Sequence, residues 1–376
     1  MMESRAMRRR AIALPLLAAA LLSGCGGGHG HLVVGGVEDA AKWADPGGNM
    51  ALAARAGFRV IVLSSVWRPP LWAPPPGEVY RLRTPIDIAE TDGIRPIVAV
   101  YSFSRDTPLT SRARAQFSSY AAALLRAIPE LRFISLGNEP NSNRFWIPQF
   151  GPRDFDAAAA AYFRLLETAY PVVKKANPDV TVIGGSLAAR GGDNPRSSRP
   201  THSPTRFIDD LGAAYRASGL PRPPLDLFSI HPYPANSSIP PSATDPHSTS
   251  IGIADYPKLV HLLTRAFRKP PPIVYGEYGI QTRIPRSELD LYSGVRPRSI
   301  RPVSETRQAD DYVDAIRLAA CQPLVRMLIF FHVTDESALT GLQTGLFYPN
   351  GRPKRSLGRV AAAAGAAEKG KVKCDS

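Results

Sequence analysis

The stretch "LRFISLGNEPN", residues 131–141, carries the clearest signal for the fold of this chain. Its central part, "RFISLG" (132–137), is short and almost continuously apolar, which is typical of a strand buried on both faces of a parallel sheet. Asn138 and Glu139 follow directly, and Pro140 then interrupts the extended segment. An isolated glutamate at a strand end is usually solvated or salt-bridged, so the role of Glu139 depends on the rest of the chain.

Apolar runs of the same kind recur along the chain and alternate with helical patterns rich in alanine and leucine. The other seven runs span residues 32–37, 59–65, 95–101, 180–186, 225–231, 271–277 and 325–332. The helical patterns span residues 48–57, 111–128, 154–176, 206–219, 256–267, 306–321 and 354–370. Between the second and third runs the chain is rich in proline, and a helix is expected only over residues 86–91.

Eight strand–helix units that repeat about every 40 residues predict an α/β protein with a single (β/α)8 TIM barrel. We expect the barrel, with a C-terminal helix and tail, to span residues 32–376 without a linker. The alternative is a doubly wound open sheet, which usually has fewer strands and a glycine-rich phosphate turn after the first. The segment after residues 32–37 contains no GxGxxG pattern, which favours the barrel.

The N-terminus has the pattern of an export signal. Residues 8–10 are all arginine, a short apolar stretch follows, and small residues precede Cys25. We therefore expect residues 1–24 to be a signal peptide and residues 25–31 to be a flexible tether. The ending "LSGC" resembles the lipobox of bacterial lipoproteins, which implies a lipid anchor on Cys25 and a place on the cell envelope. A plain secretory signal, with a secreted product, is the alternative.

Composition limits the partners. Of the 376 residues, 44% are apolar and 21% are charged, which is typical of a globular chain and not of a disordered one. Without residues 1–24 the chain has 42 basic and 31 acidic residues, a net charge of +11. These cations are scattered and form no basic block interleaved with aromatic residues, so we expect no nucleic-acid partner. We also expect the protein to be a monomer. Cys321 and Cys374 would either pair in an oxidising exterior or stay free.

Two carboxylates suggest the chemistry. Glu139 follows the fourth strand and Glu277 lies at the end of the seventh, so in a closed barrel they can face each other across its mouth. Such a pair suits cleavage of a glycosidic bond, in which one group protonates the leaving oxygen while the other attacks the sugar or activates water.

Three segments, "SLGNEPN", "FSIHPYP" and "IVYGEYG", resemble the strand-four, strand-six and strand-seven signatures of the retaining glycoside hydrolases of clan A. The resemblance does not single out one family, and cellulase-like family five and xylosidase-like family thirty-nine are both candidates. The resemblance implies that Glu139 is the acid/base, that Glu277 is the nucleophile and that Asn138 binds the sugar 2-hydroxyl. It also implies that His231 and Tyr233 line the subsite, with Tyr233 bonded to Glu277, and that neither a metal nor another cofactor is needed.

Further residues are expected near the mouth, because apolar sugar faces stack on flat rings. The aromatic candidates in the loops after strands two and four are Trp67, Trp72, Phe145 and Trp146, and loop packing is the alternative for each tryptophan. Arg68 is a candidate for the strand-two arginine that many clan members aim at the nucleophile. The clan often has a tryptophan at the end of strand eight, where this chain has Phe331 and His332 as candidate replacements.

The function predicted from the sequence is hydrolysis of a β-linked glycan or glycoside by an exported retaining glycosidase. The alternative is a non-catalytic carbohydrate-binding lipoprotein on the same barrel. An esterase is disfavoured because the sequence has no GxSxG elbow to position a serine.

Overall fold

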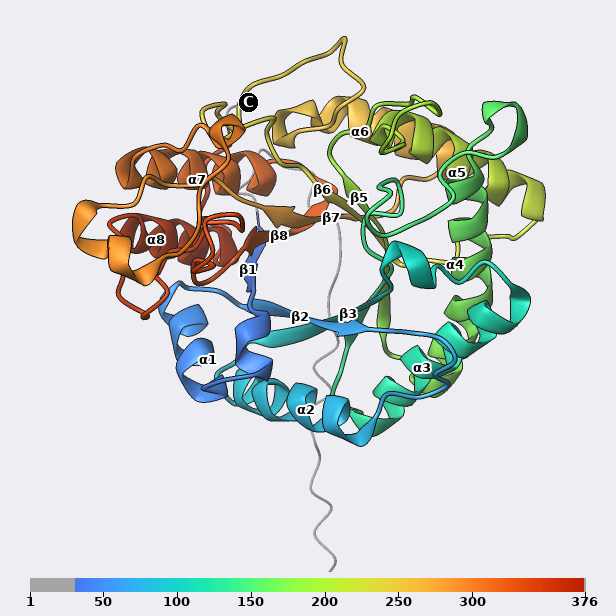
Figure 1. Cartoon of the computed structure of the whole chain (residues 1–376), viewed down its shortest axis with the longest axis horizontal. Coiled ribbons are helices and arrows are strands. Elements are labelled where there is room, and N and C mark those ends of the chain that lie inside the picture. The colour runs from blue at the N-terminus through green and yellow to red at the C-terminus, as the bar shows by residue number, and fades with distance from the viewer. Residues whose placement is uncertain (1–30, 375–376) are drawn as a thin grey trace, which may run out of the picture.

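The computed structural model describes residues 31–374. Within that part the chain forms eight parallel strands that close into a barrel in chain order, with helices arranged around the ring of strands (Figure 1). The predicted single (β/α)8 barrel is therefore confirmed, and the open-sheet alternative is wrong. The expected signal peptide, the lipidated Cys25 and all of the tether except its last residue lie outside the described residues.

The strands are β1 (Val33–Val37), β2 (Val60–Val66), β3 (Arg95–Tyr101), β4 (Phe133–Leu136), β5 (Thr181–Ala188), β6 (Leu227–His231), β7 (Ile273–Tyr278) and β8 (Val325–Phe331). The helices are α1 (Pro46–Arg55), α2 (Pro76–Thr91), α3 (Ser111–Ala127), α4 (Ala157–Ala176), α5 (Pro204–Ser218), α6 (Tyr256–Phe267), α7 (Glu305–Ala320) and α8 (Leu357–Glu368). Each predicted strand and helix appears, with shifts of a few residues at most at the ends of the strands. No described helix has the length and apolar character that a membrane crossing requires.

The strands are apolar on both faces because each face meets a separate core. Inside the barrel, a ring of apolar side chains from six strands fills the part below the strand ends. The opposite faces of the strands pack against the helices in a much larger core. This double burial explains the continuous apolar runs in the sequence.

Helix α2 is longer than the sequence predicts. It begins at Pro76, ten residues before the expected start at residue 86, and contains Pro85 in its interior. Proline is favourable at the first helical position because its fixed φ suits a helix and its missing N–H has no partner there. The prolines that suggested a loop therefore mark the start of this helix, and Pro85 is tolerated because tertiary packing buries it.

Both ends of the described chain lie at the face where the strands begin. The amide of Leu32, just before β1, donates to the carbonyl oxygen of Ala367 in α8 at 3.1 Å. A disulfide joins Cys321, which caps the C-terminus of α7, to Cys374 in the tail. The pairing that the sequence left open is thus present, and it fixes the tail close to the beginning of β8.

Candidate active site

A cavity of about 310 Å³ opens where the strands of the barrel end. Its lower walls are aliphatic side chains of the barrel interior, and its upper walls carry polar and aromatic groups from the strand ends. Glu139, Glu277, Asn138, His231 and Tyr233, which the sequence placed at one site, all line it. Barrel enzymes keep their sites at this face, so the cavity is the candidate active site.

The turn after β4 has an unusual backbone that directs Glu139 into the cavity. Gly137 has φ 91° and Glu139 has φ 38°, both in the left-handed region that glycine tolerates and glutamate adopts at a cost. A Cβ on Gly137 would lie 2.8 Å from a ring carbon of Tyr162. The strained Glu139 is held from the next strand, because its amide donates to the carbonyl oxygen of Ser186 in β5 at 2.8 Å.

Strand β5 is irregular at the same level. Its register with β6 shifts between Gly185 and Leu187, which leaves Ser186 with φ 48°. Such bulges re-aim backbone groups next to active sites. Tyr162 links the two strands, since its hydroxyl donates to Leu136 O at 2.7 Å and accepts from Gly185 N at 2.8 Å.

Asn141, the last residue of the "NEPN" motif, joins the loops that follow β4 and β5. Its side-chain amide donates to the carbonyl oxygens of Ala188 and His202 at 3.1 and 3.0 Å. Its Oδ1 accepts from the amide of Ala188 at 2.9 Å, and the residue is fully buried. Asn141 therefore holds the loop that begins at Glu139 against its neighbour.

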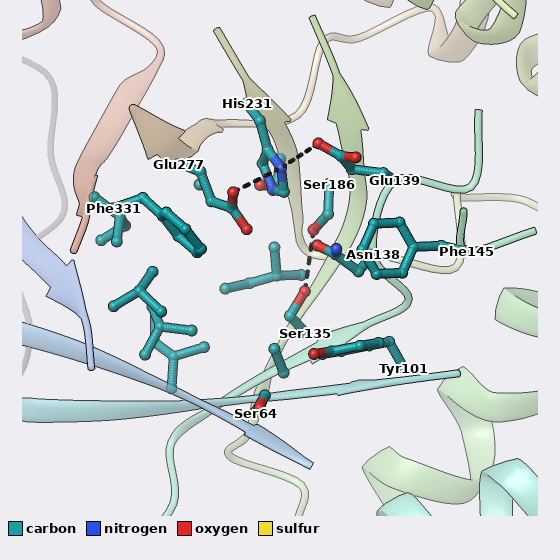
Figure 2. Close-up of a pocket in the computed structure, with 18 of the residues that line it drawn as sticks. Ser64, Tyr101, Ser135, Asn138, Glu139, Phe145, Ser186, His231, Glu277 and Phe331 are labelled. Atoms are coloured by element: carbon teal, nitrogen blue, oxygen red, sulfur yellow. Dashed lines mark hydrogen bonds and ion pairs between the residues drawn. The ribbon is translucent and has the colours of Figure 1, made fainter. Parts of the chain in front are cut away.

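The carboxylates of Glu139 and Glu277 both lie near the imidazole of His231. Nδ1 of His231 lies 3.3 Å from Oε1 of Glu139 and 3.6 Å from Oε2 of Glu277 (Figure 2). The hydroxyl of Tyr233 donates to the same Oε2 at 3.2 Å, which is the contact that the sequence resemblance implies. One oxygen of each carboxylate and the imidazole nitrogen all lie within 4.8 Å of one another.

The electrostatics of this group follow from its burial. Burial is the main reason that the pKa of Glu277 rises to about 7; the charge of Glu139 adds to the rise, whereas His231, Tyr233 and Arg144 oppose it. Burial alone would lower the pKa of His231, but the two carboxylates outweigh it and raise that pKa. The imidazole therefore tends to hold a proton, and this cation together with the Tyr233 hydroxyl stabilises Glu277 in its ionised form.

The same three groups could also hold a metal. In the described part of the chain they are the one cluster of histidine, cysteine and acidic side chains with ligand atoms close enough to share an ion. One imidazole and two carboxylates suit zinc or another transition metal.

Two tryptophans do not contact the cavity. Trp67 is fully buried, donates from its indole nitrogen to Leu71 O at 2.8 Å and packs edge-on against Phe117 of α3. Trp146 is 3% exposed and packs edge-on against Tyr162. Neither lines the cavity, which corrects the expectation that they contact the sugar and supports loop packing for both.

Arg68 and Trp72 are also placed away from the cavity, with exposed side chains in the loop after β2. This corrects the expectation that Arg68 points at the nucleophile. The arginine follows the end of β2 by two residues, after the chain has left the barrel wall. At the end of β8, Phe331 and His332 do line the cavity, where the resemblance places a tryptophan, and the peptide bond between them is cis.

Several cavity residues were missed at the level of sequence. They are Asp39, Ser64, Tyr101, Phe103, Arg144, Ser135, Ser186 and Ser229. Many of them continue a spacing of two from inward-facing aliphatic residues, as in Val62 and Ser64 or Ile97, Ala99 and Tyr101. That alternation was the available signal, and it is obscured because the outward-facing residues are apolar as well.

Comparison with solved structures supports the fold. The chain resembles a family 39 glycoside hydrolase from the gut symbiont Bacteroides cellulosilyticus WH2, with a TM-score of 0.65 and 20% identity over 90% of this chain and 64% of that one. It resembles a monomeric β-xylosidase from Caulobacter crescentus CB15, with a TM-score of 0.57 and 17% identity over 89% of this chain and 68% of that one. It also resembles an endo-β-1,4-mannanase from Thermotoga petrophila, with a TM-score of 0.56 and 10% identity over 93% of this chain and 79% of that one.

These likenesses establish that the chain has the eight-stranded barrel found in these glycoside hydrolases. It spans slightly less than two thirds of the length of the family 39 structure. No protein-family model matches the sequence, and comparison with curated proteins gives no match.

Proposed function

We propose that this protein is a retaining glycoside hydrolase of the clan A type, acting as a monomer on a β-linked glycan or glycoside. The observation that carries the proposal is the approach of the Glu139 and Glu277 carboxylates, with one oxygen of each within 4.8 Å across the cavity. Retaining enzymes hold these groups about 5–5.5 Å apart, whereas inverting enzymes need about 6.5–9.5 Å to admit a water molecule.

The geometry suits double displacement. Ionised Glu277 attacks the anomeric carbon while protonated Glu139 gives its proton to the departing oxygen, which leaves a glycosyl ester on Glu277. Glu139, now ionised, then takes a proton from water as the water attacks the same carbon and releases Glu277. Asn138, adjacent to Glu139 in the cavity wall, would donate to the sugar 2-hydroxyl oxygen.

His231 and Tyr233 have supporting roles in this scheme. Both face Oε2 of Glu277, so they orient that carboxylate and leave its other oxygen for the attack. The raised pKa of Glu277 makes this support necessary, because a nucleophile that bound a proton would not react. Phe331 lies at the cavity wall across from Asn138 and offers an aromatic face to the sugar (Figure 2).

The location of the enzyme is part of the proposal. The signal-like residues 1–24 and the sequence around Cys25 support export and attachment to the cell envelope as a lipoprotein, with secretion as the alternative. Metabolic labelling with a fatty acid, compared between the full chain and its Cys25→Ser variant, tests the anchor.

Trapping with 2-deoxy-2-fluoroglycosides tests the chemistry. We expect a panel of these reagents to label Glu277, with the site located by peptide mass spectrometry, and we expect Glu277→Gln to abolish turnover. Glu139→Ala should slow natural glycosides much more than aryl glycosides with good leaving groups, since only the former need the acid in the first step. Glu90→Gln, which removes an exposed carboxylate from α2, is the matched control.

Full turnover by both active-site variants would contradict the proposal. Sugar binding without hydrolysis or labelling would instead favour the non-catalytic carbohydrate-binding protein. That alternative is supported by the absence from the cavity of both the strand-eight tryptophan and the strand-two arginine.

A further inference from the structure

The cavity wall formed by β1 to β3 carries a third carboxylate. Asp39 follows β1 at the start of a single turn of 3-10 helix, Asp39–Lys42, and lines the cavity. Its Oδ1 accepts from the amide of Ser64 in β2 at 2.7 Å, and its Oδ2 accepts from the hydroxyl of the same serine. Ser64 and Tyr101, the last residue of β3, lie together on this side (Figure 2).

Ser64 holds the carboxylate of Asp39 in place without using all of its hydrogen-bond acceptor positions. An ionised carboxylate has about four acceptor positions, and Ser64 occupies two of them. The residue is only partly buried, unlike Glu38 beside it, which is turned away from the cavity and accepts from the amides of Ala40 and Thr334. The proposed mechanism assigns no task to the remaining acceptor positions of Asp39.

Tyr101 extends this wall toward the catalytic pair. Burial is the main reason that its pKa rises to about 12, and the charges of Asp39 and Glu277 add to the effect. Its phenol therefore stays neutral and can both donate and accept a hydrogen bond. Asp39, Ser64 and Tyr101 together form a polar surface of the cavity on the side of β1 to β3, and we call it the β1–β3 wall.

The position of a sugar ring follows from the catalytic groups. Attack by Glu277 requires the anomeric carbon to lie between Glu277 and Glu139, and Asn138 takes the hydroxyl on carbon 2. Carbons 3 and 4 are on the side of the ring away from the anomeric carbon. Their hydroxyls then extend across the cavity toward the β1–β3 wall.

We propose that Asp39, oriented by Ser64, accepts hydrogen bonds from the 3- and 4-hydroxyls of the sugar bound at Glu277 and thereby selects the glycone. This inference rests on the proposed glycosidase function, because that function places the anomeric carbon. The preferred glycone has a free vicinal diol at carbons 3 and 4. A sulfate ester or carboxylate at those positions is disfavoured because Asp39 repels it.

A binding experiment can test Asp39 without turnover. The background is Glu277→Gln, and the ligands are the 4-nitrophenyl β-D-glycosides of glucose, xylose and mannose, which share the same configuration at carbons 3 and 4. Calorimetry gives the Kd of each, and then the Kd of the 3-deoxy and 4-deoxy forms of the tightest ligand. The measurements are repeated with Asp39→Asn, and with Asp87→Asn as an exposed control on α2.

Asp39→Asn keeps the shape and an acceptor for the Ser64 amide but removes the charge. We expect it to weaken binding of the parent glycoside about tenfold, because hydrogen bonds to charged groups are roughly twice as strong as neutral ones. The effect should shrink toward twofold or less with the deoxy form that lacks the contacted hydroxyl. Asp87→Asn should change nothing, and thermal unfolding should show both variants folded.

Equal weakening of the parent and both deoxy glycosides, or no weakening, would overturn the inference and leave Asp39 a purely structural anchor. Failure of all three parent glycosides to bind would overturn it too, because they share the diol. Hydrolysis is scored separately in the protein with Glu277 intact. Lack of turnover there contradicts the proposed function, whereas the binding cycle still decides the role of Asp39.

Discussion

The charge of Glu139 should control the pH at which Glu277 becomes a nucleophile. The nearest oxygens of the two groups are within 4.8 Å, which gives a repulsion of about 3.5 kcal/mol at an effective dielectric constant near 20. That energy equals about 2.5 pKa units if both charges sit on those two oxygens. Each charge is spread over two oxygens, so we expect Glu139→Gln to lower the pKa of Glu277 by about 1 to 2 units.

The direction of the expected pKa shift of Glu277 follows from the negative charge of Glu139. Burial is the main reason that the pKa of Glu277 rises to about 7, and the negative charge of Glu139 raises it further. Without that charge the proton leaves at lower pH. The acid limb of the reaction at Glu277 should therefore move down in the Glu139→Gln variant.

Inactivation by a 2,4-dinitrophenyl 2-deoxy-2-fluoroglycoside isolates this step, because so good a leaving group needs no proton from Glu139. The second-order rate constant of inactivation is measured against pH for the wild type, for Glu139→Gln and for the exposed control Glu90→Gln. The control should superimpose on the wild type. An acid limb that stays in place or moves up in Glu139→Gln would refute the contribution of the Glu139 charge and leave burial as the cause of the raised pKa of Glu277.

Four other outcomes are expected. Tyr233→Phe removes the hydrogen bond to Glu277 and should raise the acid limb of kcat/KM by about 1 to 2 units, because a bond to a charged group contributes about 1.5–3 kcal/mol. Cys321→Ser opens a disulfide across 53 residues and should lower the free energy of unfolding in urea by about 2–4 kcal/mol. Lys354→Met should cost about 3–5 kcal/mol in the same assay by leaving the buried Asp335 charge unpaired, and adding Asp335→Leu should recover most of that loss. Zinc should inhibit hydrolysis competitively, because it binds the two carboxylates and the imidazole, and a chelator should reverse the inhibition. Unaltered rates in millimolar zinc would contradict the prediction that these three groups can bind a metal.

The sequence predicts the barrel well because each strand is apolar on both faces and each is followed by a helix. The pairing of Glu139 with Glu277 also follows, since parallel strands present their carboxyl ends at one face. The directions of loop side chains could not be obtained in this way. Trp67 follows a strand that ends at Val66, and its ring turns outward to α3 because that core offers a larger apolar contact than the cavity.

Asp39 illustrates a different limit. Asp39 follows the inward-facing Val37 by two residues, but every position of β1 is buried, so only the closed barrel shows whether Glu38 or Asp39 enters the cavity. The strained conformation of Glu139 depends in the same way on a long-range contact, with the carbonyl of Ser186 in β5. Such contacts join segments that are distant in the chain, and no local periodicity records them.

The position of the chain ends has a consequence for access to substrate. Leu32 and Cys374 both lie at the face where the strands begin, which is opposite the mouth of the cavity. A protein attached to a membrane through the segment before Leu32 would stand with its mouth directed away from the lipid. Under the proposed function, long polysaccharides could then approach from the surroundings without passing between the protein and the membrane, and released sugars would diffuse outward.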